Sequence, residues 1–227
     1  ASDVYKRQPI NSGVFCLKKD RFQDVVWIGT DGQGVYLYSN PLYSIKSMVL
    51  SNYTEKIERP VRAIYLDDER TFWVGTKGNG ILKIYDYEFD KNISDCRAEV
   101  LTTSNSALSS NAVYCFAKSH RNLLWIGDEE GLTYYSYREK RIKSIPIRIG
   151  NEDFKYIHDI YETADSELWL ASVGMGVVKA RIAGTPDNPV IVDAQRYVIN
   201  DGELGSNYFF TIYAVSYTHL TLPTIRL

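Results

Sequence analysis

Short hydrophobic runs alternate with turns along the chain, and one pattern of runs recurs four times. Each copy centres on a tryptophan, in VVWIGTDGQGVYLYS, TFWVGTKGNGILKIY, LLWIGDEEGLTYYSY and ELWLASVGMGVVKAR. These tryptophans, Trp27, Trp73, Trp125 and Trp169, are 46, 52 and 44 residues apart. In each copy a run around the tryptophan, a glycine-containing turn and an alternating run together predict a β-hairpin.

A further strand-like run lies on either side of each hairpin. The upstream runs are GVFCLKK, VRAIYLDD, AVYCFAK and YIHDIYET, and the downstream runs are YSIKSMVL, RAEVLTT, RIKSIPI and QRYVIN. Four short antiparallel strands per period of about 45 residues are typical of a β-propeller blade. We therefore expect an all-β propeller, an incomplete arc of a larger, seven-bladed ring. Its four four-stranded blades would span about 13–50, 60–103, 111–148 and 155–200, followed at 206–214 by the first strand of a fifth.

The repeats also predict what holds each blade together. Blades diverge from the axis, so the four indole rings are expected to act as wedges in the widening gaps. Tight hairpins need glycine where φ is positive, which predicts turn positions for Gly32, Gly34, Gly78, Gly80, Gly174 and Gly176. The third repeat is one residue shorter and has Gly131 alone, and the fourth has Ala171-Ser172 where the first two have Gly-Thr.

Composition narrows the function classes. The 227 residues carry a formal charge of −2, and no basic cluster interleaves with aromatic residues, which argues against a nucleic-acid partner. The acidic runs 67–69 and 128–130 lack the spacing of a calcium loop and are interpreted as solvated turns, so no metal is expected. Nucleophile, zinc-protease and phosphate-loop motifs are absent, which predicts no enzymatic activity for this chain and no cofactor. Cys16 and Cys115 occupy equivalent positions and are expected to be buried free thiols.

Both ends of the chain have an unusual property at the DNA level. Residues 1–8 and the run VSYTHLTLPT can be encoded by DNA segments that are reverse complements of each other, as in a transposon sequencing adapter. We therefore interpret residues 1–8 and 215–227 as translated adapter. The native part would then be residues 9–214, a fragment of a longer protein.

The Trp-Ile-Gly-Thr string with two spaced glycines resembles the two-component regulator propeller repeat. The matching residues are Val26–Thr30 with Gly32 and Gly34, Phe72–Thr76 with Gly78 and Gly80, and the blade-opening loops 108–113 and 204–207. Such repeats form the periplasmic sensor region of Bacteroidetes hybrid two-component histidine kinases. The resemblance implies a periplasmic part of an inner-membrane protein that works as a homodimer. It would detect glycan fragments and signal to a histidine kinase that lies, like the remaining blades, outside this chain.

Ligand contacts are expected on one face of the propeller. In an antiparallel meander, the loop leading into the first strand and the turn between the second and third strands emerge on the same face. The candidates from the leading loops are Arg59, Arg62, Asn111, Tyr156, His158, Asn207 and Tyr208, and those from the turns are Lys77, Asn79, Asp128, Glu129 and Met175. Arginine and lysine favour acidic oligosaccharides, and tyrosine rings favour neutral ones. His158 and most tyrosines also fit a structural role within strands.

Two other functions stay open. A propeller lyase or hydrolase would need acidic or metal partners that converge on a histidine, for which His158 is the candidate. A protein-interaction propeller would instead show a broad apolar patch on the ligand face.

Overall fold

The computed structural model describes residues 10–39, 44–47, 59–87, 96–202 and 204–213, so the segments interpreted as adapter lie outside the described residues. The chain forms four antiparallel sheets, and each sheet contains four strands in sequence order. The first two sheets contain β1 (Val14–Lys19), β2 (Val25–Thr30), β3 (Val35–Ser39) and β4 (Ser44–Ser47), then β5 (Val61–Leu66), β6 (Phe72–Thr76), β7 (Ile81–Ile84) and β8 (Ala98–Leu101). The other two contain β9 (Val113–Lys118), β10 (Leu123–Asp128), β11 (Leu132–Ser136) and β12 (Arg141–Ser144), then β15 (Ile157–Glu162), β16 (Glu167–Ser172), β17 (Gly176–Thr185) and β18 (Asn188–Tyr197).

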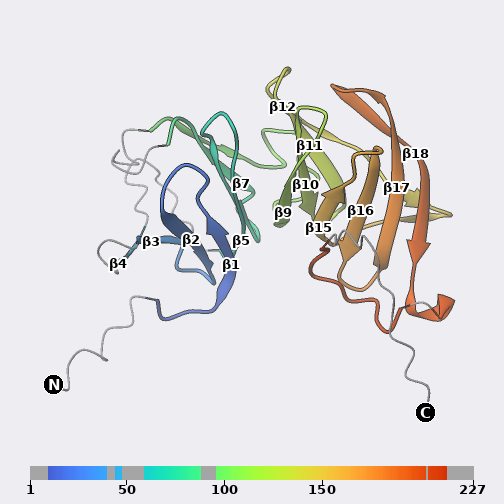
Figure 1. The fold of residues 1–227 in the computed structure, drawn as a ribbon, viewed down its shortest axis with the longest axis horizontal. Coiled ribbons are helices and arrows are strands. Elements are labelled where there is room, and N and C mark those ends of the chain that lie inside the picture. Colours follow the sequence, from blue (N-terminus) through green and yellow to red (C-terminus); the bar gives the residue numbers. More distant parts are fainter. Residues whose placement is uncertain (1–9, 40–43, 48–58, 88–95, 203, 214–227) are drawn as a thin grey trace, which may run out of the picture.

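These sheets are the blades of an arc (Figure 1). The first strands β1, β5, β9 and β15 contact one another in succession and lie toward the centre of the view, while β4, β12 and β18 lie at its left, top and right. The predicted all-β propeller with four four-stranded blades is therefore confirmed. The expected first strand of a fifth blade is an extended segment, in which Tyr208 forms an isolated bridge with Val173.

The tryptophans pack between blades. Trp27, Trp73 and Trp125 are completely buried. The ring of Trp27 lies 4.6 Å from that of Phe72 in the next blade, and the ring of Trp73 lies 4.9 Å from that of Tyr135. Burying an indole contributes several kcal/mol before opposing terms, so each of these residues stabilises a blade interface.

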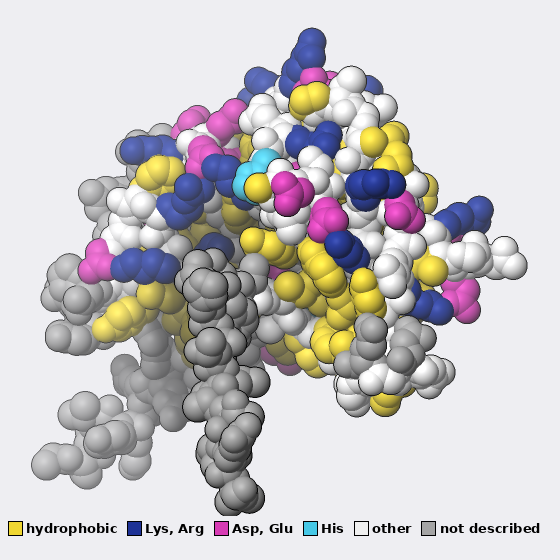
Figure 2. All heavy atoms as spheres, turned by 45° about the vertical axis from the view of Figure 1, so that its right-hand side comes forward, with side chains coloured by type: hydrophobic (Ala, Val, Ile, Leu, Met, Phe, Trp, Pro, Cys, Tyr) yellow, Lys and Arg dark blue, Asp and Glu magenta, His cyan; other side chains and the backbone are white. Residues whose placement is uncertain are grey.

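Trp169 is only partly buried, because it lies on the face of blade 4 that no further described blade covers. Its ring stacks on Tyr197 of the same blade at 6.0 Å. Tyr161 on the neighbouring strand is 40% exposed. Figure 2 turns this end of the arc toward the viewer and shows hydrophobic side chains gathered there, with charged side chains around them.

A second glycine position, two residues after the tryptophan, sets how closely blades approach. A Cβ atom on Gly127 would lie 2.5 Å from Cys115 Sγ and 2.7 Å from the carbonyl oxygen of Ile157 in the next blade. Gly29 and Gly75 are confined in the same way. The fourth repeat has Ala171 here, and this alanine is completely buried.

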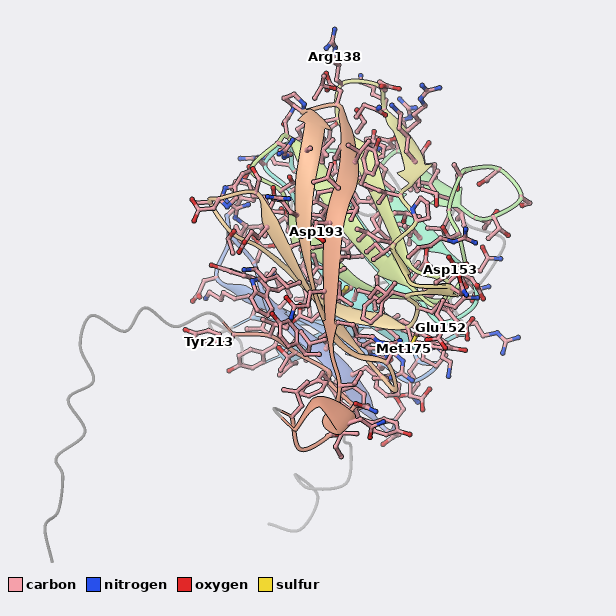
Figure 3. All side chains as sticks on the ribbon, turned by 90° about the vertical axis from the view of Figure 1, so that its right-hand side faces the viewer. Arg138, Glu152, Asp153, Met175, Asp193 and Tyr213 are labelled. Atoms are coloured by element: carbon pink, nitrogen blue, oxygen red, sulfur yellow. The ribbon has the colours of Figure 1, made fainter. Side chains whose placement is uncertain are left out.

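Blade 4 carries additions that the described parts of the other blades lack. Its β17–β18 hairpin has ten residues in each strand, and the short hairpin β13 (Arg148–Ile149) and β14 (Glu152–Asp153) precedes it. A 3-10 helix, η3 (Ile199–Asp201), follows β18. Arg138, in the β11–β12 turn, and Met175, in the β16–β17 turn, lie toward opposite ends of the sheets (Figure 3). The arc therefore has two distinct faces, and the predicted ligand residues belong to the face of Met175.

Candidate functional site

The leading loops and the β2–β3-type turns meet on one face, which we call the axial face. In blade 2 the Lys77 amide donates to the carbonyl oxygen of Pro60 at 2.8 Å, and in blade 4 the Val173 amide donates to that of Tyr156 at 3.2 Å. Blades 1 and 3 repeat this bond. The two kinds of segment are thus held side by side in every blade, as the antiparallel meander predicts.

Every first strand carries a β-bulge at the same place on this face. Val61 pairs with Thr76 but Ala63 pairs with Gly75, which leaves Arg62 as an extra residue. The same register shift makes extra residues of Phe15, Tyr114 and His158. A bulge redirects the side chain of its extra residue, and bulges are frequent next to functional sites.

The redirected side chains contact one another around the arc. The Arg62 guanidinium lies 3.5 Å from the centre of the Phe15 ring. The rings of Tyr114 and His158 stack at 4.3 Å, with 12° between their planes. Phe210, which holds the same place in the segment after blade 4, meets His158 edge-on at 5.4 Å. We call Phe15, Arg62, Tyr114, His158 and Phe210 the bulge residues.

Burial and neighbouring charges keep the His158 ring neutral. Burial lowers its pKa to about 4, and the positive charges of Arg62 and Lys77 act in the same direction. The pKa of Tyr114 is raised by burial and by the negative charge of Glu129. At neutral pH the stack therefore presents two uncharged planar rings beside one guanidinium, which suits contact with the face of a sugar ring.

Two predicted tyrosines add exposed rings to the axial face. Tyr156 is 42% exposed and Tyr208 is 66% exposed, and both belong to leading loops. Tyr156 has φ of 55°, a left-handed conformation that is strained for a bulky residue. Such strain persists only where the surroundings impose it, and it is enriched at ligand sites.

Asn111 and Asn207 join neighbouring blades. The carbonyl oxygen of Asn111 accepts bonds from the amides of Gly78 and Gly80, both at 2.9 Å, and its side chain accepts one from the Thr103 amide. Asn207 makes the same three bonds two interfaces further on, with the amides of two glycines and of Ile199. Both residues thus have a structural role, and contact with ligand stays a prediction for them.

The remaining candidate residues differ in exposure and in hydrogen bonding. Arg59 and Lys77 are exposed, Asn79 is half-buried, and Met175 Sδ accepts a bond from the Lys155 amide at 3.3 Å. The structure thus brings Arg62 and His158 together through residues that sequence reasoning missed: Phe15, Tyr114 and Phe210. Superposing the repeats would have found them, because each lies three residues after the residue that aligns with Asn111.

The interpretation of both acidic runs as solvated turns was wrong for one residue in each. Asp67 and Asp128 are 1% and 0% exposed. Asp128 replaces a threonine of the first two repeats and accepts the amides of Glu130 and Gly131, both at 2.9 Å. In the second repeat a threonine holds this position, and its hydroxyl donates to the carbonyl oxygen of Gly80 and accepts the Asn79 amide, both at 2.9 Å.

Burial raises the pKa of Asp128 to about 7, from 3.8 in an unstructured chain, although hydrogen bonds from four backbone amides oppose the shift. Between these pH values the folded chain binds more protons than the unfolded chain, so the free energy of unfolding falls as pH rises. Asp128→Asn keeps the acceptor oxygen and removes the titration. We expect its stability advantage over the parent to grow from near zero at about pH 4 to several kcal/mol at about pH 8, as measured by urea unfolding. Parallel stability curves would contradict this assignment.

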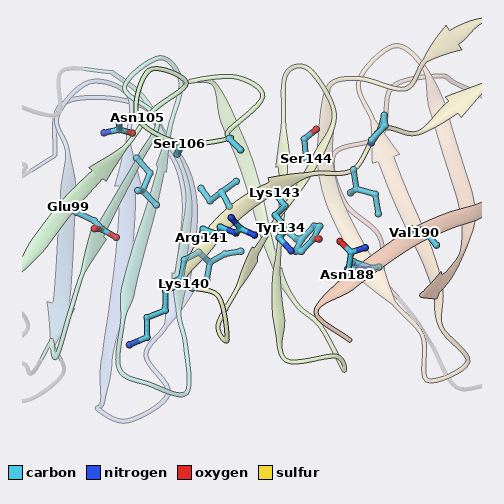
Figure 4. Close-up of a pocket in the computed structure, with 17 residues that line it drawn as sticks. Glu99, Asn105, Ser106, Tyr134, Lys140, Arg141, Lys143, Ser144, Asn188 and Val190 are labelled. Atoms are coloured by element: carbon cyan, nitrogen blue, oxygen red, sulfur yellow. The ribbon is translucent and has the colours of Figure 1, made fainter. Parts of the chain in front are cut away.

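A cavity lies away from the axial face. It has a volume of about 800 Å³ and surrounds β12 at the outer rim, between β8 and the β17–β18 hairpin (Figure 4). None of the predicted ligand residues lines it. Two of its cations, Arg141 and Lys143, are both paired with Glu139 at 2.5 Å, so one carboxylate offsets part of their positive charge.

Other chemistry is limited among the described residues. No group of three or more His, Cys, Asp or Glu side chains there could hold a metal ion. Cys16 and Cys115 are free thiols; Cys115 is buried and Cys16 is half-buried. No helix in the described ranges is long and apolar enough to cross a membrane.

Comparison with known proteins relates the chain to two solved structures. One is the extracellular domain of a protein described as a hybrid two component system from B. thetaiotaomicron, with a TM-score of 0.62 and 24% identity over 86% of this chain and 24% of that one. The other is PorZ, a surface component of the type-IX secretion system of Porphyromonas gingivalis, with a TM-score of 0.63 and 15% identity over 87% of this chain and 29% of that one. The chain shares their fold. It spans less than a third of either protein.

No family model matches the chain. Among curated proteins, translation initiation factor 6 of Saccharolobus solfataricus is 31% identical over 140 residues, which cover 56% of this chain and 57% of that protein. The chain thus spans little more than half the length of this curated relative, and the match does not define its family.

Proposed function

We propose that this chain is the ligand-sensing part of an extracytoplasmic propeller in a membrane-bound two-component regulator, and that it detects glycan fragments. The observation that supports this most directly is the row of bulge residues, in which each blade offers one side chain at the same place on the axial face. The fold shared with the extracellular domain from B. thetaiotaomicron supports the regulator class. Glycan binding would shift a homodimer between two states and so bias a histidine kinase elsewhere in the protein.

Tyr114→Ala tests this function at the centre of the site. The substitution removes the ring on which His158 stacks, so we expect affinity for a bound oligosaccharide to fall about tenfold. A glycan array identifies binders and calorimetry on the full chain measures their affinity. Tyr161→Ala, on the open face of blade 4, is the matched control and should bind as the parent does. Equal binding by both variants would remove the bulge residues from the site.

A protein-interaction role is the second candidate, and two observations favour it. PorZ, which shares the fold, is described as a component of a secretion system, and Val190 and Val192 of β18 are 43% and 52% exposed. The full-length reading frame separates the two roles. A membrane helix followed by a histidine-kinase core supports the sensor, whereas a stop codon soon after the last blade contradicts it. The enzyme alternative has less support, because the ring contacts of His158 are to Tyr114 and Phe210 rather than to acids.

A further inference from the structure

Most cations in the described part of the chain are paired with acids. Ion pairs join, for example, Arg138 to Asp187, Lys155 to Glu130 and Arg196 to Glu152. Among the cations that form no ion pair with a described residue, Arg59, Arg62 and Lys77 are grouped on the axial face. Unpaired charges grouped on one face indicate a partner of opposite charge.

The three cations all belong to blade 2 and lie close together. Lys77 begins the turn that is bonded to Pro60, the residue after Arg59. The Arg59 side chain lies across this turn, since its carbons and Nε would be 3.5–3.6 Å from a Cβ atom on Gly78. Arg62 follows two residues after Pro60, at the bulge.

Arg62 has an unmet hydrogen-bonding need. Its guanidinium covers the Phe15 ring, and its Nε is buried without a hydrogen-bond partner among the described residues. A buried donor without an acceptor destabilises the free protein. The terminal nitrogens of the guanidinium are the donors that an anionic ligand would use. Arg62 and Lys77 both lie near enough to His158 to act on its charge. Two of the three cations therefore act electrostatically on the ring stack.

The acidic groups in the turns of this face are Asp31 of blade 1, which is exposed, and Asp128, Glu129 and Glu130 of blade 3. Glu129 acts on the charge of Tyr114 and accepts a weak bond from the Ser110 hydroxyl at 3.4 Å. Glu130 is paired with Lys155, and Asp128 is buried beneath its own turn. The side of the axial face formed by blade 2 is thus positive, and the adjoining side formed by Tyr114, His158 and Phe210 is uncharged.

Resting on the proposed function, we infer that the ligand is an acidic oligosaccharide. Its carboxylate or sulfate group would bind Arg62, Arg59 and Lys77, and its sugar ring would lie against the Tyr114–His158 stack. The arginine fork matches either anion through paired N–H bonds, whereas a neutral sugar would leave all three charges unmet.

Calorimetry with matched sugars tests this inference on the full chain. The probes are oligogalacturonate, its neutral methyl ester, a sulfated chondroitin oligosaccharide and a neutral glucan oligosaccharide. We expect one of the acidic probes to bind at least about tenfold more tightly than both neutral probes, with affinity that falls as salt is added. Whether oligogalacturonate or the chondroitin probe binds distinguishes a carboxylate from a sulfate ligand.

Charge variants locate the anion. Arg62→Ala and Lys77→Ala should each weaken binding of the acidic probe about tenfold or more, whereas Arg181→Ala, an exposed cation on β17, should not. Lys77 is exposed, so its variant reports on binding even if Arg62→Ala perturbs folding. Equal affinity for acidic and neutral sugars, unaffected by Arg62→Ala and Lys77→Ala, would overturn the inference and leave the sensor function standing. Absence of binding to all four probes, and to a wider glycan array, would overturn both.

Discussion

Replacing Asp67 with alanine is expected to lower the free energy of unfolding by about 3–5 kcal/mol. One Asp67 oxygen accepts the amides of Glu69 and Thr71, at 2.9 and 2.8 Å, and the other accepts Trp73 Nε1 at 2.9 Å and the Tyr137 hydroxyl at 3.2 Å. Trp73 is completely buried and Tyr137 belongs to the next blade. The Asp67 carboxylate therefore closes the β5–β6 turn, holds the Trp73 ring in place and joins two blades. Each buried donor left without an acceptor costs roughly 1–3 kcal/mol.

Urea unfolding followed by tryptophan fluorescence measures this effect. Asp193→Ala is the matched control, because Asp193 is an exposed carboxylate on β18 (Figure 3) and its loss should change stability by no more than about 0.5 kcal/mol. Asp67→Asn should fall between the two, since an amide keeps one acceptor oxygen. An Asp67→Ala variant as stable as Asp193→Ala would show that this carboxylate does not hold the blades together.

The blade architecture could be predicted because each hairpin depends on residues that are close together in the sequence. A Trp-centred run, a glycine turn and an alternating run need only their own residues to form a hairpin, and four copies make the period evident. The burial of Trp27, Trp73 and Trp125 follows from the same pattern. Trp169 departs from it because burial depends on a neighbouring blade, which no local pattern encodes.

Contacts between blades were beyond sequence reasoning. Lys83 occupies a strand position that predicts a solvated side chain, yet it is 3% exposed and donates to the Tyr135 hydroxyl of the next blade at 2.8 Å. Asp67 and Asp128 look like turn residues until their acceptor roles are seen in three dimensions. In each case the deciding partner lies across a turn or an interface rather than at a fixed sequence spacing.

The sequence predicts the face on which the candidate site lies, but it does not predict all of the residues in that site. Topology alone puts the leading loops and turns on one face, which brought in Arg62, Lys77 and His158. Strict alternation along a strand gives no reason to select Tyr114, because the bulge that redirects it has no signature in a single repeat.

Glu162→Ala is expected to lower the free energy of unfolding by about 3–5 kcal/mol. Glu162 accepts the indole N–H of the blade 3 tryptophan, whereas in blades 1 and 2 an aspartate of the same blade accepts it. Trp27 Nε1 donates to Asp20 at 2.8 Å, within the same blade. The third repeat has Ser119 at the aspartate position, and Trp125 Nε1 donates instead to Glu162 of blade 4 at 2.7 Å. The Glu162 side chain is 1% exposed and also accepts the His120 amide at 3.3 Å.

A double-mutant cycle tests whether Glu162 truly substitutes for the missing aspartate. Ser119 already makes the backbone contacts of the aspartates, since its amide donates to Leu123 and its hydroxyl accepts the Arg121 amide at 3.0 Å. Ser119→Asp alone should destabilise, because it places a second carboxylate at the Trp125 indole. In the Glu162→Ala background the same change should restore about 1–3 kcal/mol, because the indole regains an acceptor within its own blade. Additive losses in the double variant would mean that Glu162 acts through its ion pair with Arg121, whose Nε lies 3.9 Å from its carboxylate, rather than through the indole.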